Sequence, residues 1–248
     1  MGQFPDYPLK AKAVPNPIVA AHKIWRSGLS ALFPQACYVC GASAGRRFVC
    51  LSCIAELSPA PFPACPICAE ASPRGEPCGR CLARRPYYDA TQAAFAYAFP
   101  LREIVHAFKF DARFAAGVFL GEALAAAGEG IDADCVLPVP LHPARLKQRG
   151  FNQSVLLAKQ VAKRLRLPLW FEAVLKDREL PPQAGLDLAA RRRNLAGAFR
   201  AVRNFEGRRV LVIDDVMTSG ATLDELARTL KAVGAKTVEN LVVARAAR

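Results

Sequence analysis

The sequence lacks any long hydrophobic run, although 52% of its 248 residues are hydrophobic. No stretch approaches the ~18 consecutive apolar residues that a helix needs to cross a bilayer. The first residues, MGQFPDYPLKAKAVPNP, have charges and prolines but neither the apolar segment nor the small-residue cleavage site of a signal peptide. We therefore expect a soluble, cytoplasmic protein that does not insert into membranes.

Acidic residues are also scarce relative to basic ones. The chain has 21 aspartates and glutamates against 34 lysines and arginines, which gives a net charge of +13 at pH 7. A surplus of this size suits polyanionic partners such as nucleic acid or phosphorylated metabolites. A solvated basic surface without a dedicated partner explains the charge equally well.

Cysteine, in contrast, is abundant and regularly spaced. Eight of the nine cysteines form C-x-x-C pairs: Cys37 and Cys40, Cys50 and Cys53, Cys65 and Cys68, Cys78 and Cys81. The first four positions recur 28 residues later, so the segment is a tandem duplication. Two C-x-x-C turns supply the four sulfur ligands that a structural zinc ion prefers. We expect two Zn²⁺ ions per chain.

The zinc ligands can pair in two ways. Sequential pairing groups residues 37–53 in one site and 65–81 in the other, whereas cross-braced pairing interleaves them; shorter closure loops favour sequential pairing. Disulfides are a weaker alternative because thiols stay reduced in the cytosol, and an iron–sulfur cluster ranks with them. The ninth cysteine, Cys135, lies in the apolar run DCVLPVP and is expected to be a buried core residue.

The chain length suits one α/β domain with a smaller unit. We expect a leader helix within residues 1–36, the zinc module at 37–84 and the larger domain at 85–248. Strands are expected at 91–99, 134–139, 169–176, 198–202, 208–214 and 236–245, and helices at 101–110, 113–127, 151–166 and 222–234. This alternation with continuous apolar strands predicts a parallel sheet flanked by helices on both faces.

The segment RRVLVIDDVMTSGATLDEL, residues 208–226, describes a ligand site. Asp214 and Asp215 follow a buried strand, at the end where ligands of open α/β sheets bind. The loop VMTSGAT runs into a helix near Thr222, so several backbone N–H groups converge there and favour a phosphate. Carboxylates that bind vicinal hydroxyls beside an anion site suit a ribose 5-phosphate. An ordinary tight turn with a capping threonine is the alternative, but it leaves the two acids unexplained.

This segment resembles the phosphoribosyl pyrophosphate motif of the type I phosphoribosyltransferases. The resemblance implies that Asp214 and Asp215 bind the ribose hydroxyls. It also implies that the loop residues bind the 5-phosphate: Met217, Thr218, Ser219, Gly220, Ala221 and Thr222.

A second segment, VLPVPLHPARLKQRGFNQS at residues 136–154, places a strand end and a basic loop where that family has its pyrophosphate loop. Arg145, Lys147 and Arg149 would then face the diphosphate, with solvated surface as the alternative. His142 would approach the diphosphate or form a local hydrogen bond to the backbone.

Together with RELPPQAGLDLAARRRNLAGAF at residues 178–199, the second segment resembles the ComF family. The resemblance implies a type I phosphoribosyltransferase fold, an α/β parallel sheet flanked by helices, behind an N-terminal double zinc ribbon. It also implies binding of phosphoribosyl pyrophosphate with Mg²⁺. A link to DNA uptake, with single-stranded DNA and DNA-uptake proteins as partners, follows from the same resemblance.

The ComF pattern adds further site residues. Gln183, Arg193 and Asn194 match a mobile loop and a short helix that would close over the ligand and exclude water. Lys109 also matches a family position.

The expected reaction is displacement of pyrophosphate from the ribose anomeric carbon by an amine or heterocyclic nitrogen. Asp214, Asp215 and Arg149 would act by positioning and charge stabilisation, and Mg²⁺ would neutralise the leaving group. Glutamine-dependent relatives use an N-terminal cysteine. Here the chain starts Met1, Gly2, Gln3 and its first cysteine is assigned to metal, so we expect no glutamine hydrolysis.

Two other functions remain open. In the first, the protein is a sensor or DNA-handling factor that binds phosphoribosyl pyrophosphate without turnover. Alternatively, the zinc module would clamp nucleic acid in a salt-dependent way, or its basic residues would merely make it soluble. The arginines concerned are Arg46, Arg47, Arg74, Arg80, Arg84 and Arg85.

Overall fold

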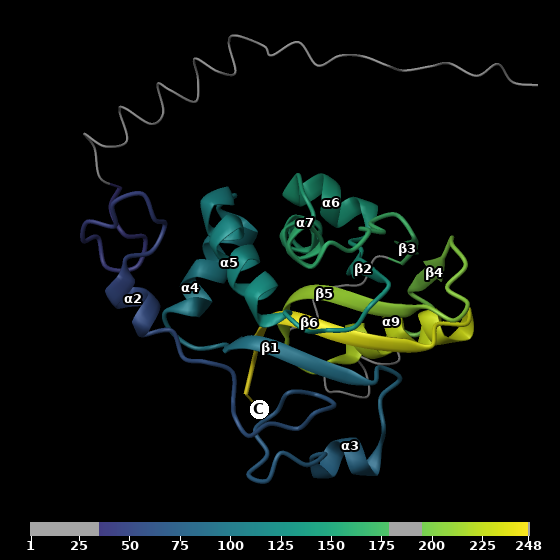
Figure 1. Ribbon diagram of the computed structural model, residues 1–248. Helices are drawn as coiled ribbons and strands as arrows, with labels where there is room; N and C mark the ends of the chain where they lie inside the picture. The colour runs from purple at the N-terminus through teal and green to yellow at the C-terminus, as the bar shows by residue number, and fades with distance from the viewer. Residues whose placement is uncertain (1–34, 179–194, 248) are drawn as a thin grey trace, which may run out of the picture. The chain divides into compact units, whose positions relative to one another are not determined.

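The computed structural model describes residues 35–178 and 195–247 (Figure 1). The chain divides into two compact units, residues 1–51 and 52–248, and each is described by itself. The leader up to residue 34 and the loop residues Gln183, Arg193 and Asn194 lie outside the described residues. Their predicted roles stay predictions, as do the domain limits at 37–84 and 85–248.

The described part of the first unit is a cysteine-bearing turn. Ala36 pairs with Ser43 in an antiparallel bridge, and the rings of Tyr38 and Phe48 stack with their centroids 5.0 Å apart. With so small an apolar contact, we expect this turn to need a metal ion for its order.

A four-stranded parallel sheet forms the centre of the second unit, in the order β1-β6-β5-β2. The strands are β1 (Ala90–Ala96), β2 (Cys135–Pro138), β5 (Arg209–Met217) and β6 (Thr237–Arg245). Apolar side chains on β5 and β6 are buried on both sides, as continuous apolar strands require. The parallel sheet predicted from the strand–helix alternation is confirmed.

Helices cover both faces of this sheet (Figure 1). On one face lie α4 (Leu101–Phe110), α5 (Phe114–Ala127) and α7 (Gln153–Leu165), and on the other lies α9 (Ala221–Ala232). The α9 face also carries the second cysteine repeat with its short helix α3 (Gly79–Ala83), and one hydrophobic cluster joins Ile67 of that repeat to Leu226 and Val242. The second repeat therefore shares the core of the larger unit.

Two strands lie outside the parallel sheet. β3 (Val174–Lys176) and β4 (Phe199–Ala201) pair antiparallel as a separate two-stranded sheet. The strands expected at 169–176 and 198–202 are thus shorter than predicted, and Leu169 makes only a single bridge to Val136. Each of these strands contains a basic residue, Lys176 in β3 and Arg200 in β4, so neither can be buried on both faces.

The expected basic loop after β2 is a helix, which corrects the sequence interpretation. α6 (Pro143–Arg149) begins with proline in its first turn, and the His142 side chain accepts a hydrogen bond from the Ala144 N–H at 3.2 Å. It ends at Gly150, whose φ of 81° is left-handed. A cap before proline and a glycine after the last turn are ordinary helix signals, and the charges obscured them. In the described part of the chain, no helix has the length and apolarity needed to cross a membrane.

Candidate functional site

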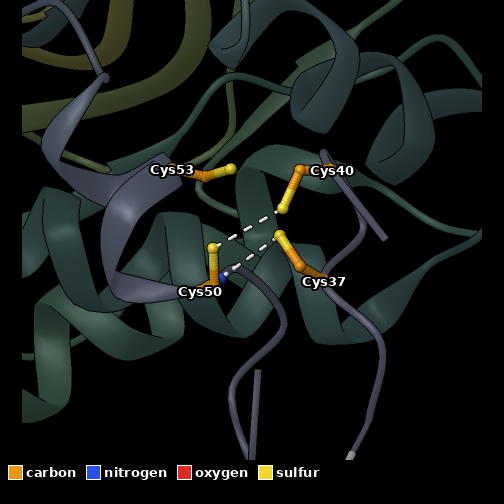
Figure 2. Close-up of side chains that lie close together, drawn as sticks. All are labelled: Cys37, Cys40, Cys50 and Cys53. Carbon is orange, nitrogen blue, oxygen red and sulfur yellow. Dashed lines mark hydrogen bonds between the residues drawn. The ribbon is translucent and has the colours of Figure 1, made fainter. Parts of the chain in front are cut away.

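Two clusters of four cysteines form the candidate metal sites. Cys37, Cys40, Cys50 and Cys53 make up one (Figure 2), and Cys65, Cys68, Cys78 and Cys81 make up the other. Within each cluster the sulfur atoms all lie within 4.8 Å of one another. The sequential pairing is confirmed.

The geometry of both clusters fits zinc. The Cys40 and Cys50 sulfurs are 3.7 Å apart and the Cys68 and Cys78 sulfurs 3.6 Å apart. A tetrahedron with Zn–S bonds of about 2.3 Å has sulfur–sulfur edges of roughly 3.8 Å. In each repeat a backbone N–H, from Cys50 or Cys78, also donates to the first sulfur at 3.3 Å, so the duplicated sequence gives a duplicated site.

Zinc content tests this assignment. Elemental analysis of the purified protein is expected to give two zinc ions per chain, one for each cluster, and Cys78→Ser should reduce this to one. Cys135→Ser is the matched control, because Cys135 is fully buried in β2 and burial raises the pKa of its thiol to about 11. A Cys135→Ser protein that loses zinc would contradict the assignment.

Asp214 and Asp215 lie in the part of β5 that extends beyond the end of its neighbour β2. β2 ends at Pro138, opposite Ile213, whereas β5 continues through Asp214 and Asp215 to Met217 and pairs there with β6. The strand thus ends three residues beyond the predicted end at Asp214. β2 does not pair with β5 beyond Pro138, so Asp214 and Asp215 lie on a strand edge that β2 does not cover.

Asp215 is buried, with 4% of its surface exposed, and is only half satisfied. Its Oδ1 accepts a hydrogen bond from the Val216 N–H at 2.6 Å and lies 2.9 Å from the Lys109 Nζ. Burial disfavours the Lys109 charge, but the ion pair with Asp215 outweighs it and raises the pKa of Lys109. Asp215 Oδ2 is buried without a hydrogen-bond partner among the described residues. An orphaned carboxylate oxygen of this kind calls for a ligand donor.

Asp214 is partly buried and held by two donors. Its Oδ1 accepts from the Ser154 hydroxyl at 3.1 Å and from the Asp215 N–H at 2.9 Å. Burial and the neighbouring Asp215 charge raise the pKa of Asp214 to about 7, while Lys109 opposes the shift. The site thus holds a carboxylate whose charge is costly when no ligand is present.

The loop after β5 leads into the N-terminus of α9. Gly220 caps this helix with a φ of 76°, and a Cβ there would lie 2.7 Å from the Met217 Cε and 3.0 Å from the Tyr88 hydroxyl. Only glycine fits that conformation and space. The first N–H groups of a helix have no intrahelical acceptor, so this turn directs them and the helix dipole at the loop. It brings together the predicted phosphate residues, from Met217 to Thr222.

Basic residues line a cavity of about 250 Å³, and one of them, Lys109, pairs with Asp215 at 2.9 Å. The structure brings three of the predicted site residues together in the wall of this cavity: Lys109, Arg145 and Arg149. Arg149 is fixed by two contacts: it donates to Gln153 Oε1 at 2.6 Å, and its guanidinium lies 5.3 Å from the Phe110 ring centroid. Lys147, in contrast, is exposed and is not among the residues that line this cavity.

Three polar residues at the site were missed by sequence reasoning. Ser154 and Gln153 are 1% and 6% exposed and hold Asp214 and Arg149 in place. Their signal was present, because Asn152 caps α7 by accepting the Ser154 N–H at 2.9 Å, which orients that first turn. Lys176 lies near Asp214 and Arg145: burial lowers its pKa, Asp214 opposes the shift and Arg145 adds to it. No local pattern marked it.

Known proteins resemble this chain in both parts. A family model described as "Phosphoribosyl transferase domain" matches residues 152–248, and one described as "Double zinc ribbon domain" matches residues 28–82. The DNA utilization protein YhgH of Shigella flexneri is 35% identical over 183 residues, 71% of this chain and 81% of that protein. Competence protein F of Haemophilus influenzae is 32% identical over 196 residues, 75% of this chain and 86% of that protein.

Among solved structures, the allosteric regulatory enzyme of purine biosynthesis aligns at 25% identity with a TM-score of 0.35, covering 50% of this chain and 24% of that one. The matched families and the parallel sheet confirm the predicted fold class, a type I phosphoribosyltransferase fold with a double zinc ribbon. The paired cysteine clusters agree with that ribbon.

Proposed function

Because the chain belongs to the ComF family, which joins a double zinc ribbon to a phosphoribosyl transferase domain, we propose that it binds phosphoribosyl pyrophosphate with Mg²⁺ and transfers the phosphoribosyl group to a nitrogen acceptor. The single observation that carries this proposal is the buried Asp215 Oδ2, which has no hydrogen-bond partner among the described residues. A ribose hydroxyl supplies the missing donor.

The proposed ligand has phosphate at both ends, and two regions of the protein suit an anion. The loop and the α9 N-terminus would hold the 5-phosphate. The diphosphate would lie against Arg145, Arg149 and Lys176. Burial lowers the pKa of both Arg149 and Lys176; Asp215 opposes the shift at Arg149 and Asp214 at Lys176, while Arg145 adds to both. A bound anion would favour both charges.

The donor set also fits Mg²⁺. Asp214 and Asp215 offer carboxylate oxygens beside the place proposed for a diphosphate, and hard oxygen ligands with substrate phosphates are what Mg²⁺ prefers. An ion held there by Asp214 and Asp215 would offset the charge of the leaving group. The fit rests on the chemistry of these two carboxylates, both of which lie at the end of β5.

The proposed reaction needs no protein nucleophile. The bond between the anomeric carbon and the pyrophosphate oxygen breaks, the nitrogen lone pair of the acceptor forms the new bond, and the acceptor proton leaves to solvent. Asp215 and Asp214 fix the ribose through its hydroxyls, while Arg149 stabilises the negative charge that develops on the departing pyrophosphate. Gln153 and Phe110 keep the Arg149 guanidinium directed at the cavity before the ligand arrives.

The cellular role proposed is in DNA use or uptake, because the relatives carry the names DNA utilization protein and competence protein. A factor that binds phosphoribosyl pyrophosphate and single-stranded DNA without turnover is the competing function. It shares the site but needs no acceptor. Pyrophosphate release separates the two.

Calorimetry with phosphoribosyl pyrophosphate and Mg²⁺ is expected to show one ligand per chain with a Kd of about 1–100 μM, in the range usual for enzyme substrates. Ribose 5-phosphate, which gives Arg145 and Arg149 nothing to bind, should bind at least about tenfold more weakly. No heat with phosphoribosyl pyrophosphate would contradict the proposal.

Turnover is measured by pyrophosphate release in the presence of ammonia, primary amines and heterocyclic bases. Release that depends on an acceptor supports the transferase. Saturable binding without release across this panel favours the non-catalytic factor.

A further inference from the structure

Arg245 is a charged residue in the interior of the protein. Among the described residues it has the largest fully buried side chain, with 1% of its surface exposed. It stands at the C-terminal end of β6, next to Met217 of β5. Its Nη1 donates to three backbone carbonyls, those of Met217 at 2.9 Å, Thr218 at 2.7 Å and Ala246 at 2.6 Å. Two of these belong to the loop that precedes α9.

The Nε and Nη2 atoms of the guanidinium contact the second zinc ribbon. Nε donates to the Cys68 carbonyl at 2.8 Å, and Nη2 forms an ion pair with Glu70. One side chain thus joins segments 177 residues apart in the sequence, Cys68 and the last strand. Because burying an unpaired charge is costly, the five acceptors must stay in place for Arg245 to remain where it is.

The ribbon side of this contact depends on the metal site. Cys68 is one of the four clustered sulfur ligands, so its carbonyl is oriented by the same turn that presents its thiolate. Arg80 adds a second tie, since it lies 3.5 Å from Glu70 Oε2 and 3.8 Å from the Cys68 sulfur. Loss of the metal from this ribbon would release the two acceptors that the ribbon gives to Arg245, the Cys68 carbonyl and the Glu70 carboxylate.

The loop side lies against the proposed phosphate site. Gly220 leaves just enough room for Tyr88, which is 4% exposed and follows directly on the ribbon. In the same stretch, the Tyr87 N–H donates to Asp224 of α9 at 2.8 Å. The segment between the ribbon and β1 therefore lies against Gly220 of the loop and is bonded to Asp224 in the first turn of α9.

We propose that Arg245 is a positioning residue that fixes the Met217–Thr222 loop on the second zinc ribbon, so that metal in the Cys65–Cys81 site sets the affinity of the loop for the 5-phosphate. The zinc ribbon is then part of the ligand site. The identity of the ligand in this inference rests on the proposed function, whereas the contacts of Arg245 do not depend on it.

The test compares the full-length protein with Arg245→Met, which keeps the bulk of the side chain and loses its donors. Calorimetry is expected to show about 10- to 100-fold weaker binding of phosphoribosyl pyrophosphate, as for other supporting contacts behind a binding site. Inorganic pyrophosphate should bind unchanged, because its proposed contacts are Arg145 and Arg149. A general loss of structure would weaken both ligands alike, and that result would overturn the proposal.

Two matched controls isolate the effect. Arg209→Met removes an arginine that pairs with Asp134 at 2.7 Å at the opposite end of β5, and it should leave both affinities unchanged. Cys78→Ser should weaken phosphoribosyl pyrophosphate as Arg245→Met does, whereas Cys50→Ser in the first ribbon removes one zinc and should not. The double variant Arg245→Met with Cys78→Ser should bind no more weakly than the weaker single variant, since both act through one contact. Additive losses would overturn the proposal.

Hydrogen exchange gives a readout without ligand. The backbone amides of residues 217–222 are expected to exchange faster in Arg245→Met and after removal of the second zinc, and at the wild-type rate in Arg209→Met. If wild type fails to bind phosphoribosyl pyrophosphate, the proposed function fails while this exchange pattern still decides the role of Arg245. Should Arg245→Met not fold, Arg245→Lys carries the same test, because lysine keeps the charge but cannot reach both segments. Unchanged exchange in the folded variant would overturn the inference.

Discussion

Replacing Asp215 with asparagine is expected to weaken the binding of phosphoribosyl pyrophosphate by at least about 100-fold. The carboxylate presents a buried oxygen with no partner of its own, and an amide NH₂ at that position would face the ribose hydroxyl with a donor. One charge-assisted hydrogen bond lost in a buried site, with a donor facing the hydroxyl in its place, accounts for a factor of this size. Calorimetry measures the affinity, and circular dichroism checks the fold.

The matched control for this change is Asp134→Asn. Asp134 directly precedes β2 and pairs at 2.7 Å with Arg209, the first residue of β5, at the opposite end of that strand from Asp215. Its removal breaks an ion pair of the same strand without touching the ligand site, so the affinity should stay at the wild-type value. If Asp215→Asn binds as tightly as Asp134→Asn, the Asp215 carboxylate is not the hydroxyl acceptor and the proposed function loses its central observation.

The parts of the site that could be predicted are those that local sequence determines. The cysteine clusters follow from two repeats of one short spacing, so each site forms within about 17 residues of chain. The acidic pair and the loop to α9 likewise follow one another directly on a buried strand. In both cases the residues that act together are neighbours in sequence, and their chemistry restricts the structures they can form.

The other contacts depend on pairings between distant segments, which periodicity does not report. Lys109 on α4 reaches Asp215 on β5, and Ser154 on α7 reaches Asp214, only because the sheet order places those helices over β5. Arg245 ended a predicted strand and gave no sign that it would be buried against Cys68. Charged residues are assigned to the surface by default, so a buried arginine is the kind of residue that sequence reasoning misses.

α6 shows a different cause. Arg145, Lys147 and Arg149 suggested a loop that binds phosphate, and the charge outweighed the capping signals of His142 and Gly150. The helix spaces these side chains around its axis, so Arg145 and Arg149, four residues apart, share the cavity wall while Lys147 does not. Secondary structure therefore decides which of the three basic residues can act at the site.

Asp214→Asn is expected to make the ligand-free protein more stable, and increasingly so as the pH rises. Burial and the Asp215 charge raise the folded-state pKa of Asp214 from its ordinary value of 3.8 to about 7. Between those values the folded state binds more protons than the unfolded state, so stability falls as pH rises, and the cost is complete above pH 7. Asparagine carries no charge and can still accept from Ser154 and the Asp215 N–H, so it removes this cost.

Urea unfolding at pH 5.5 and 8.5 measures the effect. The stability advantage of Asp214→Asn over wild type should widen by about 1–2 kcal/mol between these values, since each pKa unit corresponds to about 1.4 kcal/mol. Titration of the zinc-binding cysteines is common to both proteins and cancels in the difference. Asp134→Asn should show the opposite sign, a loss of stability at both pH values, because hydrogen bonds from Arg209 lower the pKa of Asp134 to about 2. An advantage for Asp214→Asn that is constant with pH would mean that the Asp214 charge is not the source of the strain, and would remove one reason to regard this carboxylate as waiting for a ligand.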